Sequence, residues 1–193
     1  TDLDAKDPTT QAAVPPRRGA GLVARNETLK TWVPGEDGLD VLLDAGFEDR
    51  VRADATGYAV RVAYQQPRMV SLKGAAPAEA LANTFEDALV YENLDLFQTL
   101  AGTGLIAKFR TAIAAAPDLP ALAVAVQKFL ERGKAEFAMN LLYASHKKTV
   151  AGVETEADVI DDLVVPQYIH EGLDWLAAEL KRRELELPAE AAA

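Results

Sequence analysis

The chain has no cysteine and is nearly without serine and histidine, so side chains that often act as nucleophiles or proton carriers are scarce. The absence of cysteine excludes disulfides, thiolate zinc sites and cysteine nucleophiles, and it is compatible with a cytoplasmic location. The only serines are Ser71 and Ser145, and the only histidines are His146 and His170. Neighbouring helix residues point in different directions, so Ser145 beside His146 does not predict a catalytic triad. Any chemistry must therefore rely on carboxylates, lysine, arginine and a metal ion.

Long apolar runs are absent too: none approaches the roughly 20 residues of a membrane span, and no secretory signal is present. We therefore expect a cytoplasmic protein without a membrane partner. The 193 residues, 49% of them hydrophobic, suffice for one domain with a sizeable core or for a domain with a helical appendage. The chain also lacks an initiator methionine, from which we expect it to be part of a longer polypeptide.

The net charge of −10 argues against bulk electrostatic attraction to nucleic acid. It leaves open a phosphate site bridged by metal ions, because the ions supply the positive charge.

Asp2 and Asp4 form an Asp-x-Asp motif in the opening residues. On an extended backbone two such carboxylates point to the same side and repel each other unless a cation lies between them. Hard oxygen ligands of this kind suit Mg²⁺ or Mn²⁺. The competing interpretation is a solvated acidic terminus.

The first 66 residues predict an α/β layer with a short, parallel-paired sheet. Residues 1–3 are expected to end a strand, 21–26 to form a second, and 58–65, where apolar and polar residues alternate, to form the clearest one. Short helices are predicted at 27–32 and 39–45.

Residues 67–187 predict a mainly α-helical portion, with a disordered tail at 188–193. Thr84 followed by Asp87 is a variant of the capping box and begins one predicted helix that runs to residue 100. Ile169, Leu173, Leu176 and Leu180 predict a packing seam on the last helix. The remaining predicted helices cover 105–116, 122–130 and 134–144.

Two charged residues of the helical portion stand out. Glu86 lies in the first turn of its helix, where the helix dipole alone favours a carboxylate by about 0.3–1 kcal/mol. Lys134 also lies in a first turn, where a cation is disfavoured, and it points along the buried stripe that contains Phe137. A residue that lowers the stability of its own helix without a compensating local contact is typical of a functional residue. The alternative for Lys134 is a side chain that extends past the stripe to water.

Asn26 and Gln65, at the ends of predicted strands, could line the same rim as Asp4, although turn and capping roles suit them equally. Arg17 and Arg18 belong to a Pro-rich loop that is either solvated or in contact with a phosphate.

Several stretches resemble the C-terminal nuclease region of OLD-family (overcoming lysogenization defect) proteins, and the opening Asp-x-Asp with the strand ending at Asn26 resembles the second half of a TOPRIM domain. The resemblance covers about residues 1–180. The stretches are Leu-Lys-Thr-Trp-Val-Pro at 29–34, Ala-Tyr-Gln at 63–65, Thr-Phe-Glu-Asp-Ala-Leu at 84–89, Gly-Lys-Ala-Glu-Phe-Ala at 133–138 and Val-Pro-Gln-Tyr-Ile at 165–169.

The resemblance implies an endonuclease that cuts DNA with two Mg²⁺ or Mn²⁺ ions, about 3.5–4 Å apart in such sites. Asp2, Asp4 and Glu86 become metal ligands, and Lys134 becomes the cation near the scissile phosphate. Residues 1–66 become the C-terminal half of a TOPRIM-like domain, and 67–187 a helical portion that packs back on the catalytic face. The family joins this region to an upstream ABC-type ATPase, and some members act beside a helicase in anti-phage defence. The family's upstream glutamates are not in this chain, and homo-oligomerisation through regions outside the chain stays open.

Two alternatives stay open at this level. One is another TOPRIM activity, primase-like or topoisomerase-like, although the latter needs a catalytic tyrosine and nothing marks any of the five for that role. The other is a non-catalytic, acidic helical interaction module whose Asp-x-Asp is merely solvated.

Overall fold

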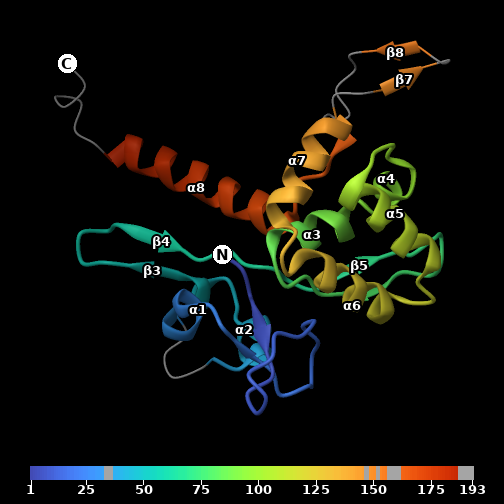
Figure 1. The fold of residues 1–193 in the computed structure, drawn as a ribbon. Coiled ribbons are helices and arrows are strands. Elements are labelled where there is room, and N and C mark those ends of the chain that lie inside the picture. The colour runs from blue at the N-terminus through green and yellow to red at the C-terminus, as the bar shows by residue number, and fades with distance from the viewer. Residues whose placement is uncertain (33–36, 146–147, 151–152, 156–161, 187–193) are drawn as a thin grey trace.

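The computed structural model describes residues 1–32, 37–145, 148–150, 153–155 and 162–186. The fold is mixed, as predicted: short strands and small helices make up the beginning of the chain, and helices dominate the rest (Figure 1). None of the helices in the described ranges is both long and apolar enough to cross a membrane. The predicted tail at 188–193 lies outside the described residues.

The N-terminal part is built from strand pairs that are antiparallel, so the predicted parallel pairing is wrong. The segment between β3 and β4, residues 54–58, is too short for the crossover that a parallel pair needs. The N-terminal elements are β1 (Ala5–Lys6), β2 (Val23–Ala24), α1 (Glu27–Trp32), α2 (Leu39–Asp44), the 3₁₀ turn η1 (Glu48–Arg50), β3 (Val51–Ala53) and β4 (Ala59–Arg61).

The strand predicted at 58–65 is much shorter in the structure. Only β4 is a strand, and Tyr58 and Val60 in and beside it are largely exposed. The chain leaves the hairpin after Arg61, and Val62 and Tyr64 then turn into the core, where the Tyr64 hydroxyl donates a hydrogen bond of 2.5 Å to the Leu42 carbonyl oxygen. The alternating pattern therefore reflects two different environments and not one continuous strand.

The helical part contains the predicted helices, with one division that the sequence did not indicate. Asn93 separates α3 from α4, because its side-chain amide donates to the carbonyl oxygens of Leu89 and Val164 and its Oδ1 accepts from Val164 N. These elements are β5 (Arg68–Val70), β6 (Ala78–Ala80), α3 (Phe85–Glu92), α4 (Leu94–Thr99), α5 (Gly104–Ala115), α6 (Leu119–Leu130), α7 (Lys134–Ser145), β7 (Lys148–Val150), β8 (Val153–Thr155) and α8 (Gln167–Glu186).

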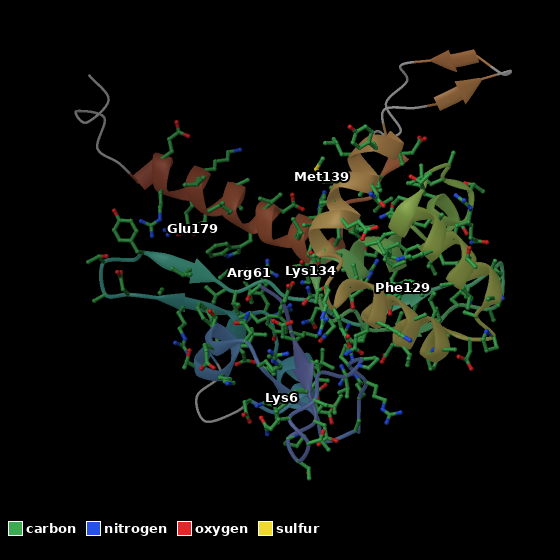
Figure 2. All side chains as sticks on the ribbon, in the orientation of Figure 1. Lys6, Arg61, Phe129, Lys134, Met139 and Glu179 are labelled. Carbon is green, nitrogen blue, oxygen red and sulfur yellow. The ribbon has the colours of Figure 1, made fainter. Side chains whose placement is uncertain are left out.

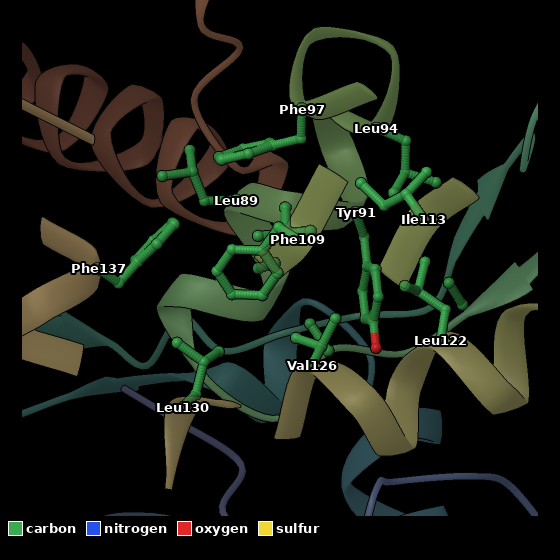
Figure 3. Close-up of a cluster of buried hydrophobic side chains, with 14 of the residues drawn as sticks. Leu89, Tyr91, Leu94, Phe97, Phe109, Ile113, Leu122, Val126, Leu130 and Phe137 are labelled. Carbon is green, nitrogen blue, oxygen red and sulfur yellow. The ribbon is translucent and has the colours of Figure 1, made fainter. Parts of the chain in front are cut away.

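Two hydrophobic clusters form the core. The larger one joins α3 to α7 around Phe97, Phe109 and Phe137, whose ring centroids lie 5.2–6.1 Å apart in contacts favourable for aromatic pairs (Figure 3). The smaller cluster belongs to the N-terminal part and includes Leu3 and Tyr64. Residues 72–82 contribute to both clusters, and the domain boundary at residue 66 stays a prediction.

The seam predicted on α8 is not a packing face. Leu173, Leu176 and Leu180 are 58%, 45% and 59% exposed. The helix instead contacts the N-terminal part at Glu171, whose carbonyl oxygen accepts a hydrogen bond of 2.9 Å from Arg61, and at Arg183, which stacks on the ring of Tyr58 at 4.0 Å. The prediction of a buried seam is therefore wrong.

The start of α3 confirms the predicted capping box. Asp87, 5% exposed, accepts hydrogen bonds from the backbone nitrogens of Asn83 (2.7 Å) and Thr84 (2.5 Å) and from the Thr84 hydroxyl (2.9 Å). Burial raises the pKa of Asp87 to about 6, against the lowering effect of these donors.

Replacing Asp87 with alanine should lower the free energy of unfolding by about 1–3 kcal/mol, because two buried N–H groups would lose their acceptor. Chemical denaturation measures the loss. Asp95→Ala, in the exposed first turn of α4, is the control and should change stability by no more than about 0.5 kcal/mol. Equal losses in both variants would contradict the capping role.

Candidate acidic site around Lys134

Asp2 and Asp4 do not lie on a strand, because β1 begins only at Ala5. Asp4 has a φ of +48°, in the left-handed region that side chains other than glycine seldom adopt. The predicted arrangement, two side chains on one side of an extended backbone, is therefore wrong. The two residues nevertheless lie close enough for the charge of Asp2 to raise the pKa of Asp4.

Asn83 holds this corner of the chain against the beginning of α3. Its backbone oxygen accepts a hydrogen bond from Asp4 N (3.1 Å), and its side-chain oxygen accepts one from Ala5 N (2.6 Å). Asn83 directly precedes Thr84, the N-cap of α3, so the same contacts bring the first turn of that helix, with Glu86, to the N-terminal aspartates.

Lys134 reaches the same place from the start of α7. Its Nζ lies 3.0 Å from Oε2 of Glu86 and 3.6 Å from Oδ2 of Asp2. Figure 2 labels Lys134 at the start of α7. The side chains of Lys134, Asp2 and Glu86 are 44%, 27% and 17% exposed, so the cluster is partly shielded yet reachable from solvent. The structure thus joins positions 2, 86 and 134 in one group.

Gly133 allows the close turn that places Lys134. A Cβ atom at this position would collide with the carbonyl oxygen of Phe129 and the side chain of Leu105. The Gly133 carbonyl accepts the first hydrogen bond of α7, from Phe137 N at 2.7 Å.

The neighbouring charges in this cluster shift the pKa values of Asp4 and Lys134. Burial and the charge of Asp2 raise the pKa of Asp4, against the opposing charges of Lys134 and Arg25. Burial alone would lower the pKa of Lys134, but pairing with Glu86 and the charges of Asp2 and Asp4 outweigh it and leave the pKa raised. The ammonium group is therefore charged at neutral pH and compensates the acidic cluster.

Gln65 and Tyr168 orient Asp2. The buried Gln65 side chain accepts from Leu3 N (3.0 Å) and donates to Asp2 Oδ1 (2.9 Å) and to the Tyr168 hydroxyl oxygen (3.3 Å). Burial and the charge of Asp2 raise the pKa of Tyr168. Of the two rim residues considered from the sequence, Gln65 thus reaches the site. Asn26 instead donates to the Thr1 hydroxyl and caps α1 by accepting from Thr28 N.

Two residues of this region, Asn83 and Tyr168, were not predicted from the sequence. Nothing local marks Asn83, since its partners lie at the other end of the N-terminal part. Tyr168 belongs to one of the stretches that carry the OLD resemblance, but the sequence offered no role for it.

The remaining candidates lie elsewhere. Arg18 pairs with Asp44 at 2.6 Å, and His170 pairs with Asp174 at 3.0 Å on the exposed side of α8. His146 lies outside the described residues.

The donor chemistry of the cluster fits a hard divalent cation. The carboxylates of Asp2 and Glu86 already share the positive charge of Lys134. Oε2 of Glu86 is shielded from solvent and accepts no hydrogen bond of regular geometry, so it is available as an oxygen ligand. In the described ranges, however, no three acidic or histidine side chains are close enough together to hold one ion. An ion bound by Asp2, Asp4 and Glu86 would therefore require these side chains to draw together.

No known protein family, curated protein or solved structure matches this chain. The OLD resemblance accordingly rests on the stretches that carry it.

Asp4→Gly should preserve or raise stability, by up to about 1 kcal/mol, because glycine adopts a positive φ without steric strain. Asp4→Ala should lower stability, since alanine keeps the strain and loses the polar side chain. Thermal unfolding of both variants measures the difference. Equal stability of the two would contradict the left-handed conformation at Asp4.

The pairing of Lys134 with Glu86 predicts an interaction free energy of about 1 kcal/mol in a double-mutant cycle. Lys134→Met leaves Glu86, Asp2 and Asp4 without compensation and should destabilise the fold at low salt. Glu86→Gln in the same chain should recover part of the loss. Additive effects in denaturation experiments would mean that the two side chains do not share this site.

Proposed function

We propose that this chain is the C-terminal nuclease region of an OLD-type ATPase–nuclease and that it hydrolyses phosphodiester bonds of DNA with Mg²⁺ or Mn²⁺. The observation that carries the proposal is the Lys134 ammonium within ion-pair distance of both Asp2 and Glu86. The proposal places the protein in the cytoplasm, with an upstream ABC-type ATPase in the same polypeptide, and leaves a helicase as a further partner.

The roles of the residues follow from their chemistry. Asp2, Asp4 and Glu86 would hold the ions, with Gln65 and Tyr168 fixing the orientation of Asp2. Bound divalent ions supply Lewis-acid stabilisation of the charge that develops on a phosphodiester. Lys134, freed from Glu86 when the carboxylates turn to the ions, would donate hydrogen bonds to a phosphate oxygen or to the leaving 3′ oxygen.

The net charge of −10 is consistent with the roles proposed for the metal ions and for Lys134. Because the surface as a whole does not attract nucleic acid, the ions and the Lys134 ammonium must provide the local attraction for the phosphate.

Nicking of supercoiled plasmid DNA in Mn²⁺ or Mg²⁺ tests the proposal, with this chain and with a longer chain that restores the upstream acidic segment implied by the resemblance. Asp2→Asn, Glu86→Gln and Lys134→Ala should each reduce the rate by about 100-fold or more, because each removes charge stabilisation from the transition state. Chelation of the metal should abolish nicking.

Matched controls change the same residue types outside the site: Lys108→Ala on the exposed side of α5 and Asp95→Asn on α4. Both should retain the wild-type rate. Absence of metal-dependent nicking even in the longer chain would favour the non-catalytic interaction module, and unchanged cutting by Lys134→Ala would remove that residue from the mechanism.

A further inference from the structure

A partly enclosed cavity of about 150 Å³ lies beside the acidic site, between the segment that follows β4, one side of α3 and the start of α8. Gln65 and Tyr168, the two residues that orient Asp2, form part of its wall. The Gln65 side chain therefore contacts the cavity and also donates to Asp2 Oδ1 at 2.9 Å. A molecule held in the cavity would lie one residue away from the carboxylate of Asp2.

The size of the cavity suits one aromatic ring. A cavity of about 150 Å³ accommodates a single six-membered ring such as benzene when its walls are apolar. Part of this wall consists of the short side chains of Ala80, Ala82 and Ala88, and the aromatic ring of Tyr91 lies beside them. Another ring can pack favourably against such a side chain. Two fused rings would need more space than the cavity provides.

The polar side chains of the wall have hydrogen-bonding capacity that the fold does not use. The Arg68 guanidinium donates no hydrogen bond within the described residues, and its Nε lies 3.9 Å from Oε2 of Glu92. The Arg68 side chain is 42% exposed, so its terminal nitrogens stay available as donors. Each carboxylate oxygen of Glu92, a side chain only 10% exposed, accepts one hydrogen bond from Gln167 N and can accept another.

These donors and acceptors limit the chemistry of an occupant. An apolar ring would leave Arg68 and Glu92 unpaired in a poorly solvated place, which is unfavourable. An anion would be repelled by Glu92 and Glu171. A pyrimidine base is a single six-membered ring with carbonyl oxygens that accept from arginine and N–H groups that donate to a carboxylate, as the cytosine amino group does to glutamate. The cavity therefore matches a pyrimidine better than a purine.

We propose that this cavity receives one unstacked pyrimidine base of the DNA strand whose phosphate reaches Lys134. Glu92 accepts from an N–H group of the base, and Arg68 donates to a carbonyl oxygen. The inference rests on the proposed nuclease function and names its substrate class. A base inside a duplex must leave the stack to enter such a pocket, which is easier where the strand is unpaired. The substrate is therefore single-stranded or locally unpaired DNA that contains pyrimidines.

A nuclear magnetic resonance titration with free nucleosides tests the cavity without cleavage. In the presence of a chelator, deoxycytidine should shift the signals of residues that line the cavity and should bind at least about tenfold more tightly than deoxyadenosine. Arg68→Gln and Glu92→Gln should each weaken deoxycytidine binding by about tenfold, because each leaves one edge of the base without its partner. Circular dichroism should show that both variants keep the wild-type helix content.

Arg17→Gln is the matched control, because Arg17 is an exposed arginine that does not line this cavity. It should bind deoxycytidine as the wild-type chain does. Absence of deoxycytidine binding, equal binding of deoxyadenosine, or unchanged binding by both Arg68→Gln and Glu92→Gln would each overturn the inference.

Cleavage of single-stranded homopolymers in Mn²⁺ separates this inference from the proposed function. Oligodeoxycytidine should be cut at least about tenfold faster than oligodeoxyadenosine, and Arg68→Gln should reduce this ratio. Equal rates on the two strands would overturn the inference and leave the nuclease proposal intact. Deoxycytidine binding without cleavage of any strand, even by the longer chain, would overturn the nuclease proposal alone and retain the cavity as a pyrimidine site.

Discussion

The two hydrogen bonds that Asn83 accepts from the first residues of the chain are the constraint on which the rest of the acidic site depends. They join a segment that belongs to the N-terminal cluster to the first turn of α3, which belongs to the helical cluster. Asparagine suits this position because its backbone and side-chain carbonyls together satisfy two N–H groups. An apolar residue at 83 would leave the buried Ala5 N–H without an acceptor, which is more unfavourable than the loss of an exposed hydrogen bond.

The charge of Lys134 also holds the N-terminal part and the start of α3 together, through Asp2 and Glu86. At the start of α7 the ammonium group is at the unfavourable end of the helix dipole, and two carboxylates from distant parts of the chain compensate it. Neither the lysine nor the acids would be well placed without the others. Lys134 is therefore unfavourable for its own helix but favourable for the contact between distant parts of the chain. Residues that disfavour their local structure in this way are often retained for function.

The sequence predicted most of the helices because their signals are local. The Thr84–Asp87 capping box needs only neighbouring residues, and the structure contains it. The convergence of Glu86 and Lys134 on Asp2 required that the helical part fold back on the first residues, which the sequence motivated only through the resemblance.

The failures have non-local causes. Strands of two or three residues carry too little pattern to fix their direction, so the sheet was predicted parallel and is antiparallel. The left-handed backbone of Asp4 depends on hydrogen bonds to Asn83 and Arg25, which no local rule reveals. Leu173, Leu176 and Leu180 of α8 have the spacing of a packed helix face but are exposed, because periodicity alone does not show what lies opposite a helix.

Contacts near both of its ends fix the direction of α8. At its root Glu92 accepts hydrogen bonds from Gln167 N at 3.1 Å, and Asn93 bonds to both backbone groups of Val164. Near its other end Arg183 stacks on the ring of Tyr58. The 20 residues of α8 rise by about 1.5 Å each. The length of α8, about 30 Å, therefore connects the end of α3 to the turn of the β3–β4 hairpin, where Arg183 bonds to Gly57, so a displacement at one end would be transmitted to the other.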